Sequence, residues 1–332
     1  MWRRAFLAAS AGFFTTSSVF LAPKDSGRVS HPANLPIEDR FVIDSLGQVK
    51  LAAVFDGHGG WQISEYLHKN IKDRIEVLSK TNTNWDQVLN SAFDQLESEL
   101  IDLVRGSYKL GFSSVASVGS CATVALILDK YFVVANAGDC QAVLVTNKNG
   151  DIQGINICQI HSSNLKVEQQ KLAKEHPNED DIVRCRSAKA CYVKGRLMPT
   201  RAFGDFHLKH QEFNNPDKLS YVFGFKRSHI ENFTGPYITH KPDVQVRNIE
   251  SGDKFLILAT DGLWDELSEQ QAAEIVYNAE SPQKAADLLL EAALDHAAYD
   301  NNMKRVELDG LPFGKKRSYH DDITIVVVSL NS

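Results

Sequence analysis

The stretch LAAVFDGHGG at residues 51–60 is an apolar run that ends abruptly in an acid, a glycine, a histidine and two more glycines. Other acids also lie at the ends of apolar runs or just upstream: Glu38-Asp39, Asp139, Asp261 and Asp321-Asp322. Each follows or precedes a predicted strand, so a folded sheet can gather these acids at one edge. Carboxylates in one place repel one another unless a multivalent cation holds them. The pattern therefore suggests a hard-metal site and hydrolytic chemistry.

The composition is that of an ordinary globular protein, with 332 residues, 43% of them hydrophobic and 23% charged. The formal net charge of -6 gives no long-range attraction for nucleic acid or anionic lipid. Because no basic stripe with interleaved aromatic residues occurs, we expect no nucleic-acid partner. The five cysteines are an odd number without CxxC spacing, and we expect free thiols in a reducing compartment.

Residues 1–24 are considered separately as a targeting segment, and residues 25–332 as the catalytic domain. The first 24 residues contain Arg3 and Arg4, several hydroxyl residues and no acid. This composition is typical of a mitochondrial presequence. Two alternatives stay open: a secretory signal, since residues 5–22 are largely apolar, or a first strand at residues 17–21. Hydroxyl residues interrupt the apolar run, which is marginal for a span of about 20 residues, so we expect no stable membrane insertion of the mature domain.

The order of predicted elements favours a single α+β domain. Strands are predicted over residues 40–43, 50–55, 121–128, 131–137, 141–146 and 323–330, and helices over 61–78, 88–104, 165–175, 268–277 and 282–298. Residues 244–249 and 254–260 are predicted to form one further strand pair around a Ser-Gly-Asp turn. Strands and helices that come in blocks with short connections indicate antiparallel sheets flanked by helices. Residues 207–236 have no clear period and are either a lid or recognition loop, or an ordinary surface excursion.

The chemistry of residues 56–58 fits hydrolysis of a phosphate ester. Asp56 offers a carboxylate and Gly57 a backbone carbonyl, both of which are ligands that hard divalent ions prefer. Two such ions about 4 Å apart activate a shared water, and His58 is placed to protonate the leaving oxygen. The alternative for each residue is structural, because Asp-Gly pairs are common in turns and Asp139 also fits a plain hairpin turn.

Six motifs occur in an order that resembles the metal-dependent protein serine/threonine phosphatases of the 2C type. They are FDGHGG from residue 55, GSCATVALI from 119, NAGDCQAVL from 136, RAFGD from 201, LATDGLWD from 258 and DDIT from 321. The resemblance extends from about Asn34 to the C-terminus. It implies an α+β fold in which a central sandwich of two antiparallel β-sheets is flanked by α-helices on both faces (α-β-β-α). It also implies hydrolysis of phosphoserine and phosphothreonine in a phosphoprotein substrate.

The resemblance further implies Mg²⁺ or Mn²⁺ as the cofactor, with two ions and in some members a third. Asp56 is then expected to bridge both ions, Gly57 to offer its carbonyl and Glu38 to act in the shell of one ion. Asp261 and Asp321 complete the other ion's ligands, while Asp139 and Asp265 match positions that, with Asp261, hold the third ion. His58 matches the general acid, so His58 and Asp56 are the expected catalytic residues.

Within the family, several segments resemble the catalytic subunits of mitochondrial pyruvate dehydrogenase phosphatase. They include ANLPIEDR from residue 33 and LMPTRAFGDFHLK from residue 197. This branch implies a dehydrogenase component of the mitochondrial matrix as the substrate. Alternatives are a general cytosolic (cytoplasmic) 2C-type phosphatase and a pseudophosphatase that acts as a binding scaffold. The sequence leaves the oligomeric state and any regulatory subunit open.

Two departures from the family pattern bear on the site. Many members have an arginine four residues before the Glu-Asp pair to bind substrate phosphate, whereas this chain has Asn34. The phosphate-binding cation is therefore unassigned. Ile160-His161 stands where the family usually has Asp-His, which removes a peripheral acid.

Overall fold

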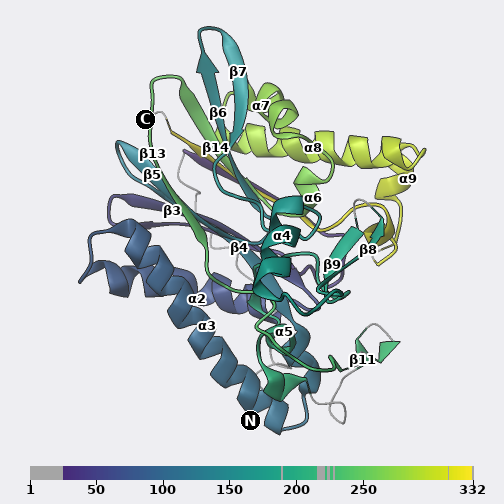
Figure 1. Ribbon diagram of the computed structural model, residues 1–332. Coiled ribbons are helices and arrows are strands. Elements are labelled where there is room, and N and C mark those ends of the chain that lie inside the picture. Colours follow the sequence, from purple (N-terminus) through teal and green to yellow (C-terminus); the bar gives the residue numbers. More distant parts are fainter. Residues whose placement is uncertain are drawn as a thin grey trace, which may run out of the picture.

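Two antiparallel sheets lie at the centre of the chain, and helices cover their outer faces (Figure 1). This computed structural model describes residues 25–187, 190–214, 221–222, 225–226, 229–312 and 314–330. The arrangement confirms the predicted α+β class and the layer order of helix, sheet, sheet and helix. The predicted targeting segment, including the alternative strand at residues 17–21, lies outside the described residues.

The first sheet has the strand order β13-β5-β4-β3-β2, and the short β10 pairs with β4. Its strands are β2 (Arg40–Leu46), β3 (Val49–His58), β4 (Gly119–Ile127), β5 (Tyr131–Ala137), β10 (Phe203–Gly204) and β13 (Asp243–Asn248). The helices α2 (Gln62–Ser79) and α3 (Trp85–Lys109) pack against this sheet. Helix α3 begins where the Asn84 side chain accepts hydrogen bonds from the backbone N–H groups of Asp86 and Gln87.

The second sheet has the strand order β1-β15-β14-β6-β7. Its strands are β1 (Ser26–His31), β6 (Gln141–Lys148), β7 (Asp151–Asn156), β14 (Asp253–Ala259) and β15 (Ile323–Ser329). The helices α7 (Glu269–Tyr277) and α8 (Pro282–Asp300) pack against this sheet. A capping box between Ser268 and Gln271 begins α7, and Ser281 caps α8, whose first residue is Pro282. Antiparallel pairing of β1 with β15 joins the two ends of the described chain.

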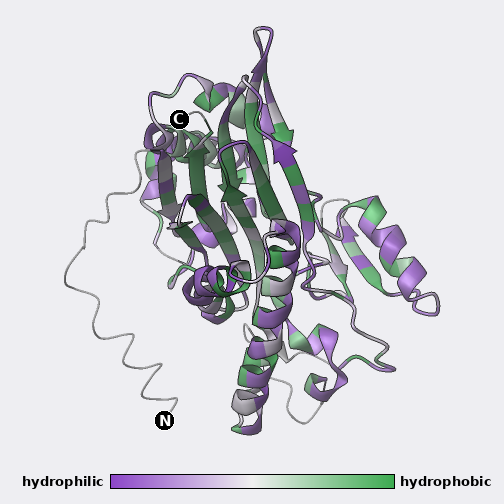
Figure 2. Cartoon of the chain, turned by 90° about the vertical axis from the view of Figure 1, so that its left-hand side faces the viewer, coloured by the Kyte–Doolittle hydropathy of each residue, from purple (hydrophilic) through white to green (hydrophobic). Residues whose placement is uncertain are grey.

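The apolar run that ends in Asp56 is buried on both faces, which explains why it does not alternate with polar residues. Ala52 and Val54 lie in the core between the sheets, together with Leu256 of β14 and Val326 of β15. The alternate residues Leu51, Ala53 and Phe55 contact the α2–α3 layer. Figure 2 shows the hydrophobic colour gathered on the central strands, with hydrophilic residues on the outward faces of the helices. This double burial fixes the register of β3 and the position of the residues at its end.

The remaining elements are smaller and lie outside the two main sheets. They are α4 (Lys166–Glu175), β8 (Val183–Ser187), β9 (Ala190–Val193), α5 (Phe206–Lys209), β11 (Tyr221–Val222), β12 (Phe225–Lys226), α6 (Asp261–Trp264), α9 (Arg305–Asp309) and three-residue 3-10 turns at Gln211–Phe213 and Lys316–Ser318. A separate small core, which includes Leu172, Val193 and Tyr237, stabilises the part around α4 and β9. None of the helices in the described ranges is long and apolar enough to cross a membrane.

The predicted strand pair over residues 244–249 and 254–260 is wrong. Strand β13 pairs with β5 in the first sheet, whereas β14 pairs with β6 and β15 in the second. The Ser251-Gly252-Asp253 turn therefore connects the two sheets instead of closing a hairpin. The Gly138-Asp139 turn also connects the two sheets, because β5 and β6 belong to different sheets. Asp139 therefore lies where the chain crosses between sheets, and the alternative of a plain hairpin turn is excluded.

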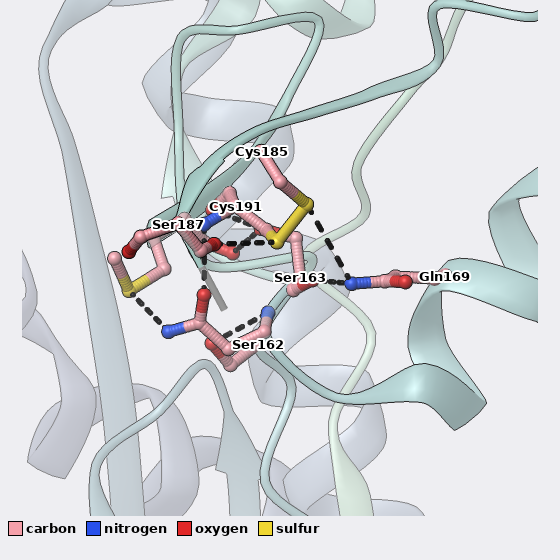
Figure 3. Close-up of a disulfide and its surroundings, with 8 residues drawn as sticks. Ser162, Ser163, Gln169, Cys185, Ser187 and Cys191 are labelled. Carbon is pink, nitrogen blue, oxygen red and sulfur yellow. Dashed lines mark hydrogen bonds between the residues drawn. A yellow bond between two sulfur atoms is a disulfide. The ribbon is translucent and has the colours of Figure 1, made fainter. Parts of the chain in front are cut away.

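The expectation that all five cysteines are free thiols is also wrong. Cys185 and Cys191 form a disulfide within the β8–β9 hairpin, where they face each other in the strand register (Figure 3). Ser163 lies against this hairpin and donates its hydroxyl to the carbonyl of Cys191 at 2.6 Å. The remaining cysteines, Cys121, Cys140 and Cys158, are buried free thiols, as expected for small core residues.

Candidate metal centre and active site

Three carboxylates from separate segments meet at one end of the sandwich. Asp56 lies at the end of β3, Asp139 lies in the crossing from β5 to β6, and Asp261 is the first residue of α6, directly after β14. One oxygen from each of the three lies within 4.8 Å of the others. Asp139 is buried and the other two are half-buried. The strand ends thus bring together three of the acids that the sequence predicts to meet.

The environment of these carboxylates fits a bound cation. Burial raises the pKa of Asp56, and the charges of Asp39 and Asp139 raise it further. Burial likewise raises the pKa of Asp261, with added repulsion from Asp56, Asp139 and Asp265. The Oδ1 atom of Asp261 is buried and has no hydrogen-bond partner among the described residues. Mutually repelling carboxylates with an unpartnered oxygen match the oxygen ligands that Mg²⁺ and Mn²⁺ prefer.

The other predicted ligands lie around this cluster rather than in it. Asp265 is one turn after Asp261 in the chain, and its backbone N–H donates to the Asp261 carbonyl at 2.7 Å. Asp321 accepts a hydrogen bond from the backbone N–H of Asp322 at 2.6 Å and pairs with Arg317. Glu38 lies in the loop before β2, and burial raises its pKa, although the charge of Arg317 opposes this shift.

Gly57 is required by the close packing of the loop that carries Glu38. A Cβ at residue 57 would overlap the Glu38 backbone carbonyl and crowd the Ser64 hydroxyl. The Ser64 hydroxyl also donates hydrogen bonds to the carbonyls of Glu38 and Trp61. Gly57 therefore lets the Glu38 segment lie directly against the end of β3.

His58 is held by a buried acid that the motif RAFGD supplies. Its Nε2 atom lies 2.6 Å from Oδ2 of Asp205. Burial alone would lower the pKa of His58, but the charge and hydrogen bond of Asp205 more than offset this, and the His58 pKa is raised. Asp205 is 1% exposed and has a left-handed backbone with φ 46°, a conformation that non-glycine residues adopt mainly where surrounding structure enforces it. A Cβ at Gly119 would overlap both side chains, so glycine there permits the pair to form.

A cavity of about 410 Å³ opens beside this pair. Glu38, His58 and Asp205 lie on its wall together with two cationic side chains, Arg196 and Arg317. A larger cavity of about 1000 Å³, lined in part by residues 229–232, shares Arg196 with it. The described part of the irregular stretch 207–236 thus lies next to the site.

The profile of the family described as Protein phosphatase 2C matches residues 27–302 of this chain. The chain belongs to the protein phosphatase 2C family. It is therefore a metal-dependent protein phosphatase, and the predicted enzyme class is confirmed.

Sequence relatives agree with this assignment, and solved structures share the fold. The chain is 34% identical to "Probable protein phosphatase 2C 67" of Arabidopsis thaliana, over 90% of this chain and 81% of the relative. It is 31% identical to "Probable protein phosphatase 2C 43" of Oryza sativa subsp. japonica, over 100% of this chain and 81% of the relative. The fold is similar to that of a serine-threonine phosphatase 2C from Toxoplasma gondii, with a TM-score of 0.61 at 19% identity, covering 92% of this chain and 94% of that one. A C. elegans sex-determining protein has a TM-score of 0.66 at 19% identity, covering 99% and 71%.

The sequence of this 2C-type phosphatase did not assign a role to three acids that organise the site. Asp205 holds His58, and Asp39 is buried with its Oδ2 accepting a hydrogen bond from Thr260 at 2.8 Å. Asp322 accepts from the backbone N–H groups of Ala33 at 2.7 Å, Asn34 at 2.9 Å and Glu38 at 2.8 Å. The motifs contained all three acids, but only the long-range contacts separate these structural acids from the ligand candidates.

Proposed function

We propose that this phosphatase hydrolyses phosphoserine and phosphothreonine in proteins with two divalent ions, Mg²⁺ or Mn²⁺, at the carboxylate cluster. The cluster of Asp56, Asp139 and Asp261 beside the paired His58 and Asp205 supports this proposal. It brings a site for cations and an imidazole with a raised pKa to one side of the sandwich. Dephosphorylation of an alcohol ester needs both, because the phosphoryl oxygens carry charge and the leaving alkoxide needs a proton.

The proposed ligand roles extend from the cluster to its neighbours. Asp56 would hold the cations together with the Gly57 carbonyl, and Glu38 would act in the shell of one ion. Asp261 and Asp321 serve the other ion, and Asp139 and Asp265 join Asp261 at a third. When bound, the cations neutralise phosphoryl oxygens and activate a water for attack on phosphorus.

His58 is proposed to supply the proton for the leaving oxygen. Asp205 occupies its Nε2 atom and favours the protonated imidazole by raising the His58 pKa, so Nδ1 is the nitrogen that remains to donate. If so, His58→Ala lowers the turnover of a phosphothreonine peptide roughly 10²–10⁴-fold, the usual range for general acid catalysis. The same change affects p-nitrophenyl phosphate much less, because an aryl oxide leaves without a proton. Equal losses on both substrates would remove His58 from the acid role.

The experiment that tests the metal requirement combines activity with direct binding. We expect the purified chain to hydrolyse a phosphothreonine peptide in Mn²⁺, to lose activity with a chelator, and to bind Mn²⁺ in calorimetric titration. Asp56→Asn removes both binding and activity, whereas Asp73→Asn, at an exposed acid on α2, leaves both unchanged. Activity that survives the chelator contradicts the proposal, and a chain that binds no Mn²⁺ is the scaffold of the pseudophosphatase alternative.

The substrate and location belong to the same proposal at a finer level. We propose a dehydrogenase component of the mitochondrial matrix, supported by the segments from residues 33 and 197 and by the acid-free, arginine-containing residues 1–24. The test compares the cellular location of the full-length chain with that of residues 25–332. Mitochondrial targeting lost on truncation supports the proposal, while a cytosolic full-length chain supports the general cytosolic phosphatase.

A further inference from the structure

Asn34 stands where many family members place a phosphate-binding arginine, and the structure gives Asn34 a different role. Its side-chain Nδ2 donates to Oδ2 of Asp322 at 3.2 Å, and its backbone N–H donates to Oδ1 of the same residue at 2.9 Å. Asn34 is therefore an uncharged residue that helps to hold the loop before β2. It lies on the wall of the 410 Å³ cavity but supplies no cation to it.

A cationic side chain from the C-terminal part of the chain lines the same wall of the cavity. Arg317 lies in the 3-10 turn Lys316–Ser318, just before β15, and lines the cavity together with Asn34, Glu38 and His58. Two contacts between the terminal segments bring it there. The backbone N–H of Gly314 donates to the Ala33 carbonyl at 3.3 Å, and Asp322 accepts hydrogen bonds from the loop of Asn34. The segments of Asn34 and Arg317, distant in sequence, thus form one side of the cavity.

The guanidinium of Arg317 pairs with one acid and retains capacity for a further ligand. Its Nη1 atom pairs with Oδ1 of Asp321, and the side chain is 45% exposed. A guanidinium has five N–H donors in a planar fork, so one carboxylate contact leaves several donors for phosphate oxygens.

We propose that Arg317 binds the phosphoryl group of the substrate, in the role that an arginine at position 34 has in many relatives. The ligand class is a phosphomonoester dianion, as in phosphoserine and phosphothreonine, or the inorganic phosphate that its hydrolysis releases. This inference rests on the proposed function, because it takes the cavity beside His58 as the place where the ester is cleaved. Arg196 lies on the same wall but belongs to the segment after β9. The variant Arg196→Gln therefore tests whether a loss of phosphate binding is specific to Arg317.

The test measures phosphate affinity separately from metal affinity. We expect Arg317→Gln to raise the KM for p-nitrophenyl phosphate and the inhibition constant of inorganic phosphate about 10–100-fold, the loss expected for a bidentate charged contact. We expect Arg317→Lys to keep part of the phosphate affinity. Lys315→Gln, an exposed residue two positions earlier, stays within about twofold of the parent because it carries the same charge change without lining the cavity. Adding Asn34→Arg to Arg317→Gln restores phosphate inhibition.

Three results overturn the inference. A phosphate inhibition constant that stays within about twofold in Arg317→Gln excludes the contact. A weaker calorimetric Mn²⁺ affinity with unchanged phosphate inhibition makes Arg317 only a positioning residue for Asp321. A loss that Arg196→Gln alone reproduces assigns the phosphate to Arg196. A parent chain without phosphatase activity is a separate outcome, since it contradicts the proposed function before any variant is compared.

Discussion

The imidazole Nε2 of His58, at the end of β3, lies 2.6 Å from the Asp205 carboxylate, 147 residues further along the chain. The two residues belong to different motifs, and their contact raises the pKa of His58. The carboxylate itself is buried, yet the charge of His58 keeps its pKa below the usual value. Each partner thus stabilises the charged form of the other.

Replacing Asp205 with asparagine should lower the His58 pKa, because the variant keeps the shape but loses the negative charge. A general acid works only while protonated, so activity on a phosphothreonine peptide is lost as pH rises through the His58 pKa. In Asp205→Asn this loss occurs at lower pH than in the parent. The measurement is the pH profile of kcat on the peptide in Mn²⁺, with p-nitrophenyl phosphate as the control substrate. If the activity of Asp205→Asn falls at the same alkaline pH as that of the parent, the role assigned to Asp205 is contradicted.

Asp261→Asn is expected to stabilise the metal-free protein while abolishing its stabilisation by Mn²⁺. The pKa values of Asp56, Asp139 and Asp261 are raised in the fold, so their contribution to stability is present at low pH and lost as pH rises through the folded pKa. Removing one of these charges relieves repulsion at neutral pH and should raise the Tm of the metal-free protein. A gain of about 1 kcal/mol in the free energy of unfolding corresponds to roughly 2–4 °C in Tm for a large domain. The measurement is thermal unfolding between pH 5 and 8 with and without Mn²⁺. A metal-free variant that is less stable than the parent at pH 8 refutes the repulsion argument.

Lys209→Met is expected to destabilise the fold by roughly 3–5 kcal/mol, because it leaves a buried carboxylate without its cation. The Nζ atom of Lys209 pairs with Glu97 of α3 and donates to the Ala202 carbonyl at 2.6 Å. The other oxygen of Glu97 accepts from the backbone N–H of Gly204 at 3.0 Å. Urea unfolding measures the loss, and the double variant Lys209→Met/Glu97→Met should cost less than the sum of the single changes. Additive single effects of less than about 1 kcal/mol would contradict a buried pair.

Thiol titration should distinguish the disulfide from the buried thiols. In the folded, untreated protein we expect no rapidly reacting thiol among the five cysteines, because Cys121, Cys140 and Cys158 are buried and burial raises the pKa of each. Mild reduction should expose the thiol of Cys185, which is the exposed partner of Cys191. The double variant Cys185→Ser/Cys191→Ser should lose this reduction-dependent signal. Rapid reaction of untreated protein would show that the pair is reduced.

Local sequence patterns predicted antiparallel sheets flanked by helices, whereas the order of the layers was implied by the resemblance to the family. The spacing of Ile63, Leu67, Ile71 and Ile75 puts one apolar face on α2, and the apolar run before Asp56 requires a strand that is buried on both sides. Sheet membership was not predictable in the same way. Strand β13 and strand β14 are separated by a turn that suits a hairpin, and a period of two residues does not say which sheet a strand joins.

The predictions for the site divide in the same way between local patterns and long-range contacts. The ends of the apolar runs indicated Asp56, Asp139 and Asp261, because a strand end is visible in the sequence. The contacts of Asp205 with His58, and of Arg317 with the cavity wall, join segments far apart in sequence, and no local pattern carries that information. The division of ligand roles among Glu38, Asp265 and Asp321 stays a prediction.

The hydrogen bonds from Ala33, Asn34 and Glu38 to Asp322 span up to 289 residues of chain. During synthesis the loop before β2 leaves the ribosome long before the carboxylate that orders it. We therefore expect a nascent chain to remain inactive until β15 has emerged and paired with β1. Late translational arrest should then give a loss of catalysis rather than the release of a partly active fragment.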